Sequence, residues 1–145
     1  FGKKPNQILN MLTFKAYNKN YKLENEWLSK NPNNISVYND DELCGFTFTT
    51  NGFINLYKLL KRAFNAKLYK VQNKNLEIFL IAGDNDPVIQ NTKKFKQLEQ
   101  FLNKLGYKNT KSKLYPDLRH EILNEEEYNQ IYKDILDFFI NNKEK

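Results

Sequence analysis

The apolar pattern is clearest in the second half of the chain, where strand-like and helix-like stretches alternate. Residues 76–82 read Leu-Glu-Ile-Phe-Leu-Ile-Ala, a nearly continuous apolar run that is typical of a strand buried on both faces of a parallel sheet. In residues 92–105 the apolar positions recur at steps of three and four, which predicts an amphipathic helix that ends at Gly106. Residues 111–115 alternate as a short strand near a sheet edge does, and Pro116 ends it.

A second amphipathic helix is predicted after a loop that holds the chain's single histidine. Asn124, with Glu127 three residues later, resembles a capping box, and residues 125–127 are acidic, which suits the start of a helix. We expect this helix to run to Asn141 and to pack a wide apolar face against a sheet. The order strand, helix, strand, helix predicts parallel strands joined by a right-handed crossover, and therefore an α/β fold.

The first half of the chain looks helical and aromatic. Apolar residues recur at helical spacing in residues 53–64, while residues 44–50 look extended or loop-like with aromatic side chains on one side. A polar Gln-Asn-Lys-Asn stretch separates this half from the second, so we divide the chain into residues 1–72 and 73–145. Because two strands make an inadequate sheet and the first half offers no further buried strand, we interpret the chain as part of a larger fold.

Composition excludes several classes of protein. With 145 residues and 40% hydrophobic content, the chain can build one ordinary core. The formal charge of +6 comes mainly from scattered lysines without a nucleic-acid recognition motif, so we expect no nucleic-acid partner. One cysteine, Cys44, and one histidine are too few for an internal disulfide or a typical zinc site, so we expect metal-free chemistry.

The chain also lacks the sequence features of a membrane or secreted protein. No apolar run approaches the roughly 18 residues that span a bilayer, and the first residues lack the apolar segment of a signal peptide. We therefore expect a cytoplasmic location. Because the chain begins at Phe1 rather than at a methionine, we also expect that it was cut or trimmed.

The candidate chemistry stands at the ends of the two predicted strands. His120 lies in the loop after residues 111–115, and Asp86 lies in the acidic turn, residues 83–88, that follows the first strand. Because parallel strands of one sheet end at the same edge, we expect Asp86 and His120 to lie close together. In that arrangement His120 would act as a general base, and Asp86 would fix the tautomer of its ring.

Each candidate also has a purely structural explanation. A loop histidine is commonly satisfied by surface hydrogen bonds, and the Asp-Asn-Asp-Pro sequence of residues 84–87 would make a good turn without any catalysis. Asp84 competes with Asp86 for the role of the acid. Cys44 as a nucleophile is a weaker hypothesis, because no strand-turn-helix elbow surrounds it.

These segments together resemble the C-terminal half of an α/β-hydrolase of the lysophospholipase, monoacylglycerol lipase and serine aminopeptidase-like family. The matching segments are residues 80–88 for the strand and acid turn, residues 114–116, 119–121 and 124–125 for the histidine loop, and residues 26–29 and 41–46 for a helical lid. In this family the acid stands immediately before Pro-Val, which favours Asp86, and the triad runs in the chain order Ser, Asp, His. The resemblance implies a partial α/β-hydrolase fold: a helical lid or cap region in residues 1–72, then the last parallel strands and helices of the sheet in residues 73–145, with the N-terminal half missing.

The same resemblance implies a serine hydrolase that cleaves carboxylic esters of lipids, such as lysophospholipids or monoacylglycerols, through an acyl-enzyme and without a cofactor. Ser29, Ser36 and Ser112 lack the Gly-x-Ser-x-Gly pattern of the nucleophile, so we nominate none of them and expect the chain alone to be inactive. One alternative is a peptidase or another amide or ester hydrolase of the same fold. Another is a non-catalytic fragment that assembles with a partner.

The resemblance also suggests partners and substrate contacts. We expect a small-molecule lipid ester as substrate, transient contact with a membrane surface, and pairing with the missing N-terminal half or with another copy of the chain. Trp27 and Phe46 in the lid-like region, and Val88 and Ile122 beside the acid and the base, are the expected substrate contacts. Aromatic side chains in a helical cap also commonly form its internal packing.

Overall fold

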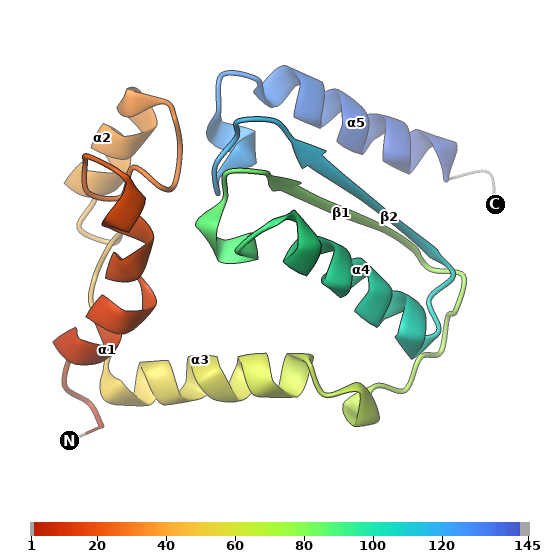
Figure 1. The fold of residues 1–145 in the computed structure, drawn as a ribbon, viewed down its shortest axis with the longest axis horizontal. Helices are drawn as coiled ribbons and strands as arrows, with labels where there is room; N and C mark the ends of the chain where they lie inside the picture. The colour runs from red at the N-terminus through yellow and green to blue at the C-terminus, as the bar shows by residue number, and fades with distance from the viewer. Residues whose placement is uncertain (1, 143–145) are drawn as a thin grey trace.

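The computed structural model describes residues 2–142, in which a helical N-terminal region precedes a small parallel sheet with flanking helices (Figure 1). The N-terminal region holds three α-helices and two 3-10 helices: α1 (Gln7–Thr13), η1 (Lys15–Asn20), α2 (Pro32–Asp40), α3 (Thr50–Ala63) and η2 (Ala66–Leu68). The C-terminal region holds β1 (Glu77–Gly83), η3 (Pro87–Ile89), α4 (Thr92–Leu105), β2 (Asn109–Tyr115), η4 (Ile122–Asn124) and α5 (Tyr128–Asn141).

The two strands pair in parallel, from Glu77 opposite Asn109 to Gly83 opposite Tyr115. Helix α4 connects them, and in Figure 1 the strands lie between α4 and α5. Helix α4 has the predicted bounds and ends at Gly106, whose positive φ of 110° closes the helix as expected. The predicted strand, helix, strand, helix order with parallel pairing is therefore confirmed, although β2 begins two residues before its predicted start.

The predicted start of the last helix is wrong. Asn124 ends the short helix η4, and its side-chain amide donates to Glu121 at 3.0 Å instead of capping α5. Helix α5 begins only at Tyr128, no side chain caps it, and its first turn contains no acidic residue. The reason is that Glu125 turns into the protein, where it accepts hydrogen bonds from other segments. The chain must finish that turn before a helix can form.

Two apolar clusters hold the described residues together. In the C-terminal region Tyr115, Leu118, Ile122 and Ile131 are buried together, with Ile81 and Ile135 packed against them. In the N-terminal region Trp27, Leu28 and Ile35 are buried, with Tyr17, Tyr21 and Tyr38 packed against them. The predicted apolar face of α5 is only partly used, because Ile131 is fully buried whereas Tyr132, Leu136 and Phe139 are exposed.

None of the helices within residues 2–142 combines the length and the apolar character that crossing a bilayer requires.

Candidate active site

The acid turn begins where β1 ends. Asp86 is the N-cap of η3, where its Oδ1 accepts the amide of Val88 at 2.8 Å, and the side chain is 6% exposed. Asp84 has a different task, because its Oδ1 accepts the amide of Asp117 at 2.7 Å and so ties the acid turn to the histidine loop. Of the two carboxylates that compete for the role of the acid, only that of Asp86 is bonded to the imidazole of His120.

The histidine loop packs directly on the end of β1. Asn85 donates its amide to the carbonyl of Leu118 at 3.0 Å. A Cβ atom added to Gly83 would overlap the carbonyl of Leu118 and would lie 2.5 Å from the carbonyl oxygen of Arg119. The loop therefore needs glycine at the end of β1, because any other residue would push it away from the acid turn.

The structure brings Asp86 and His120 together. The Nδ1 atom of His120 lies 3.0 Å from Oδ2 of Asp86, and the imidazole side chain is 40% exposed. The hydrogen bond to Asp86, reinforced by the charge of that carboxylate, raises the pKa of His120 above its ordinary value of 6.5, although partial burial opposes the shift. Among residues 2–142 no group forms a hydrogen bond with Nε2 of His120, which leaves this atom available to a reacting group.

The N-terminal region reaches both parts of the site. The backbone amides of His120 and Glu121 donate to the carbonyls of Trp27 and Leu28, at 3.4 and 2.8 Å. The ring of Trp27 lies against the imidazole, with 5.2 Å between ring centroids. The hydroxyl of Tyr21 donates to the carbonyl of Asn85 in the acid turn at 3.1 Å. Contacts from one segment therefore fix the acid turn and the histidine loop relative to each other.

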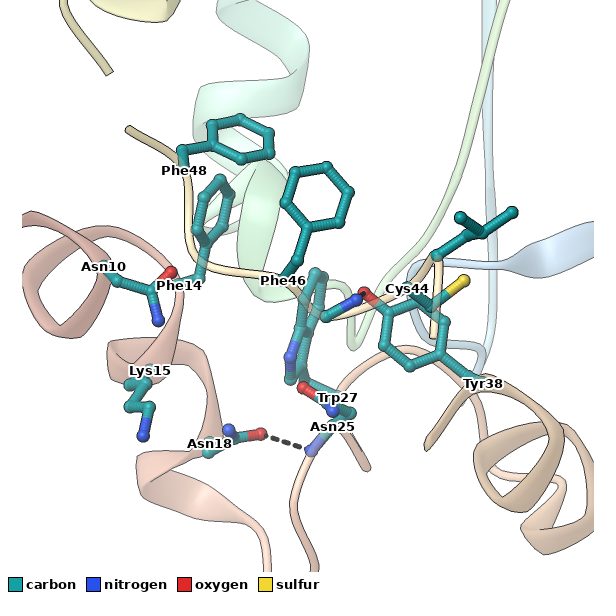
Figure 2. A pocket seen from close by; sticks show the side chains of 12 residues that line it. Asn10, Phe14, Lys15, Asn18, Asn25, Trp27, Tyr38, Cys44, Phe46 and Phe48 are labelled. Carbon is teal, nitrogen blue, oxygen red and sulfur yellow. Dashed lines mark hydrogen bonds between the residues drawn. The ribbon is translucent and has the colours of Figure 1, made fainter. Parts of the chain in front are cut away.

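An apolar cavity of about 340 Å³ lies beside Trp27, on the N-terminal region (Figure 2). The rings of Phe14, Phe46 and Phe48 gather at one end of it, and polar side chains from α1 and η1 line another side. Trp27 lines this cavity and also contacts the ring of His120, so it lies between the cavity and the imidazole. Phe46 is 61% exposed and has room to meet a ligand.

The other two expected substrate contacts lie in different surroundings. Val88 is 42% exposed beside Asp86. Ile122 is 7% exposed and belongs to the C-terminal apolar cluster with Leu118 and Ile131, so in this structure its side chain contributes to packing. Substrate contact by all four residues stays a prediction.

The serines of the chain are engaged elsewhere. Ser29 is fully buried and donates to Glu125 at 2.9 Å, Ser36 donates to Asp40 on α2, and Ser112 binds Glu99. Cys44 lines the apolar cavity, and burial, with the nearby charge of Asp41, raises the pKa of its thiol, which disfavours the reactive thiolate. Residues 2–142 contain no group of three or more metal-binding side chains.

Arg119 and Glu125, which the sequence reasoning did not count among the site residues, hold the histidine loop in place. Arg119 binds the carbonyls of Glu26 and Ser29 at 2.5 and 2.9 Å, and Glu125 is 1% exposed. The sequence places Glu125 in the segment that resembles the family's histidine loop, but the burial of its side chain depends on contacts that include Ser29, 96 residues earlier.

Parallel strands with an acid turn and a histidine loop at their carboxyl ends define part of an α/β-hydrolase fold, as the sequence predicted. The family model of the serine aminopeptidases, S33, matches residues 3–127, and the chain belongs to that family. The suspected family relationship is thus confirmed. No curated protein matches the chain.

Solved structures support the same fold. A highly thermostable carboxyl esterase from Bacillus coagulans, determined in complex with glycerol, is similar with a TM-score of 0.78 at 22% identity, over 97% of this chain and 46% of that one. A monoacylglycerol lipase from Paleococcus ferrophilus is similar with a TM-score of 0.64 at 18% identity, over 96% of this chain and 53% of that one. The chain therefore spans about half the length of these relatives.

Proposed function

We propose that this chain supplies the general base and its acid partner to a serine hydrolase that cleaves carboxylic esters of lipids. The observation that carries this proposal is the 3.0 Å hydrogen bond between Nδ1 of His120 and Oδ2 of Asp86, with Nε2 of the same ring left without a partner among residues 2–142. A ring held in this way presents a basic nitrogen at a fixed place.

In the proposed reaction, which passes through an acyl-enzyme, His120 first removes the proton from a serine hydroxyl as that oxygen attacks the ester carbonyl. The imidazolium then gives the proton to the departing alkoxide. His120 next takes a proton from water as the water oxygen attacks the acyl group, and it returns that proton to the serine oxygen as the ester bond to serine breaks and the acid is released. Asp86 holds the ring in the tautomer with its proton on Nδ1 and stabilises the imidazolium in both steps.

We assign the nucleophilic serine and the oxyanion-binding amides to residues outside this chain. Ser29, Ser36 and Ser112 are all bound to other carboxylates, and none of them stands in a Gly-x-Ser-x-Gly sequence. The similar structures are about twice as long as this chain, which leaves room for a second half. We therefore propose that the chain is catalytically complete only with that half, and we regard association with another copy of the chain as the alternative.

A lipid ester is favoured over a peptide by the apolar cavity. In this proposal residues 1–72 act as a lid whose cavity, lined by Phe14, Phe46 and Phe48, receives the acyl chain beside Trp27, whose ring also contacts that of His120. The similar structures include a carboxyl esterase and a monoacylglycerol lipase, which also supports ester cleavage. An amide substrate stays the second candidate, because the matching family model is that of serine aminopeptidases.

The test uses the protein expressed from the complete reading frame that encodes this chain, called the full-frame protein below. We expect a fluorophosphonate probe to label it, and we expect turnover of monoacylglycerols, lysophospholipids or nitrophenyl esters to exceed turnover of aminoacyl anilides. His120→Ala should abolish both labelling and turnover. Absence of labelling in the unsubstituted protein would contradict the proposal.

The 145-residue chain by itself serves as the matched control, and we expect it to have no esterase activity. Turnover by this chain that His120→Ala abolishes would show that a nucleophile lies within it, and the assignment of the serine to other residues would then be wrong. A preference for anilides over esters would transfer the proposal to the peptidase alternative.

A further inference from the structure

Glu125 is a buried carboxylate outside the acid–base pair. Its side chain is 1% exposed, and it forms no ion pair with any of the described residues. Instead it accepts hydrogen bonds from the hydroxyl of Ser29 at 2.9 Å, from the amide of Lys30 at 2.9 and 3.1 Å, and from the amide of Arg119 at 3.2 Å. Burying a carboxylate is costly unless several donors satisfy it, so this arrangement is specific for a negatively charged acceptor.

These donors come from two separate segments. Arg119 directly precedes His120, whereas Ser29 and Lys30 follow Trp27 and Leu28 in the N-terminal region. The same two segments are joined by backbone hydrogen bonds from the amides of His120 and Glu121. Glu125 therefore closes a set of contacts that holds the backbone of the histidine loop on the N-terminal region.

We propose that Glu125 is a positioning residue that sets the distance and orientation of His120 relative to Asp86. The proposal rests on the proposed function only in taking His120 as the catalytic base. Without the carboxylate, the hydroxyl of Ser29 and the two amides would lose their acceptor in a place that water does not reach. The loop would then move to satisfy them, and the hydrogen bond between His120 and Asp86 would weaken.

The experiment compares Glu125→Gln with Glu126→Gln in the full-frame protein. Glutamine keeps the shape of glutamate, but its amide nitrogen presents a donor to groups that are themselves donors. Glu126 is the exposed neighbour, so its substitution removes the same charge without touching the contacts. Two quantities are measured: the kinetic constants across pH, and the pKa of the His120 imidazole by proton NMR, with the signal assigned by its loss in His120→Ala.

We expect Glu125→Gln to lower kcat on the order of 10- to 100-fold with little change in KM, because a displaced base affects the chemical step more than binding. The pKa of His120 should fall towards its ordinary value of 6.5, since the hydrogen bond to Asp86 raises it. Glu126→Gln should change neither quantity. Glu125→Asp, which restores the charge but not the reach, should recover part of the pKa shift.

Ser29→Ala provides a milder variant in case Glu125→Gln does not fold. It removes one of the donors and should move the pKa of His120 in the same direction by a smaller amount. The proposal would be overturned if Glu125→Gln folds and leaves both the His120 pKa and kcat unchanged. If Glu125→Gln does not fold, the same result for a folded Ser29→Ala would overturn it. Because the NMR titration needs no turnover, a pKa that responds to Glu125 in a protein without hydrolase activity would support the positioning role and reject the proposed function.

Discussion

The carboxyl ends of the strands and the outer faces of α3 and α5 differ in how well the chain's own residues cover and bond their side chains. Around the strand ends Ser29, Asp86 and Glu125 are all buried, and each has hydrogen-bond partners within the chain. On the two helices many large apolar side chains are exposed instead: Ile54, Tyr57, Leu59 and Leu60 on α3, with Phe64 directly after it, and Tyr128, Tyr132, Leu136, Phe139 and Ile140 on α5.

The contacts around the strand ends hold the geometry of the site, whereas the helix faces leave apolar surface exposed. Hydrogen bonds to residues 26–29 hold the histidine loop, and the bonds of Asn85 to Leu118 and of Asp84 to Asp117 join the acid turn to that loop. For the exposed apolar side chains of α3 and α5 we propose, in contrast, a role in contact with another chain or segment. We therefore expect substitutions at the strand ends to affect chemistry most, and substitutions on the helix faces to affect assembly.

The largest effect should follow removal of the charge that holds the base. In the full-frame protein, Asp86→Asn should lower kcat by roughly 10⁴-fold, because an amide in place of the carboxylate favours the wrong tautomer of the ring. Asp84→Asn is the matched control, since Asp84 binds a backbone amide and not the imidazole. Steady-state kinetics would contradict the assignment of the acid if the Asp84 variant lost more activity than the Asp86 variant.

The next effect concerns the close contact between β1 and the histidine loop. Gly83→Ala places a methyl group against the carbonyls of Leu118 and Arg119, so it should lower the free energy of unfolding by at least about 2 kcal/mol. Gly52→Ala lies within α3, where alanine is the better helix former, and should change the free energy of unfolding by less than about 1 kcal/mol. Urea unfolding of the full-frame protein measures both. Equal effects would show that the contact at Gly83 relaxes easily.

Sequence patterns predicted these strand ends well for a physical reason. Apolar periodicity reports which face of a helix or strand is buried, so α4 and the order of elements followed from it. Asp86 and His120 could be paired because parallel strands end at one edge of a sheet. The buried position of Glu125 could not be predicted, since its partner Ser29 is 96 residues away. The late start of α5 could not be predicted either, because it follows from the burial of Glu125.

The pH dependence of catalysis and of unfolding reports on the protonation of His120. The pKa of His120 is raised by the hydrogen bond to Asp86, and a general base must be neutral, so kcat/KM should rise with pH through a midpoint above 6.5. Because the folded pKa is raised, the stabilisation from protonated His120 is fully present below 6.5 and is lost as the pH rises through the folded pKa. His120→Ala should remove this pH dependence of unfolding. A kinetic midpoint below 6.5 would contradict the hydrogen-bonded pair.

The smallest effect on the fold should come from the face of α5, where the readout is assembly. Leu136 is 57% exposed, so Leu136→Lys should change the free energy of unfolding of the 145-residue chain by no more than about 0.5 kcal/mol. The unsubstituted chain, which exposes large apolar side chains on α3 and α5, should associate with itself as its concentration rises, and the variant should do so less. Asn129→Lys, an exposed polar position on the same helix, adds the same charge and is the control. Sedimentation velocity distinguishes the outcomes. A 145-residue chain that stays monomeric and unfolds cooperatively at all concentrations would mean that these faces need no partner. The helix faces would then differ from the strand ends only in exposure and not in any role in assembly.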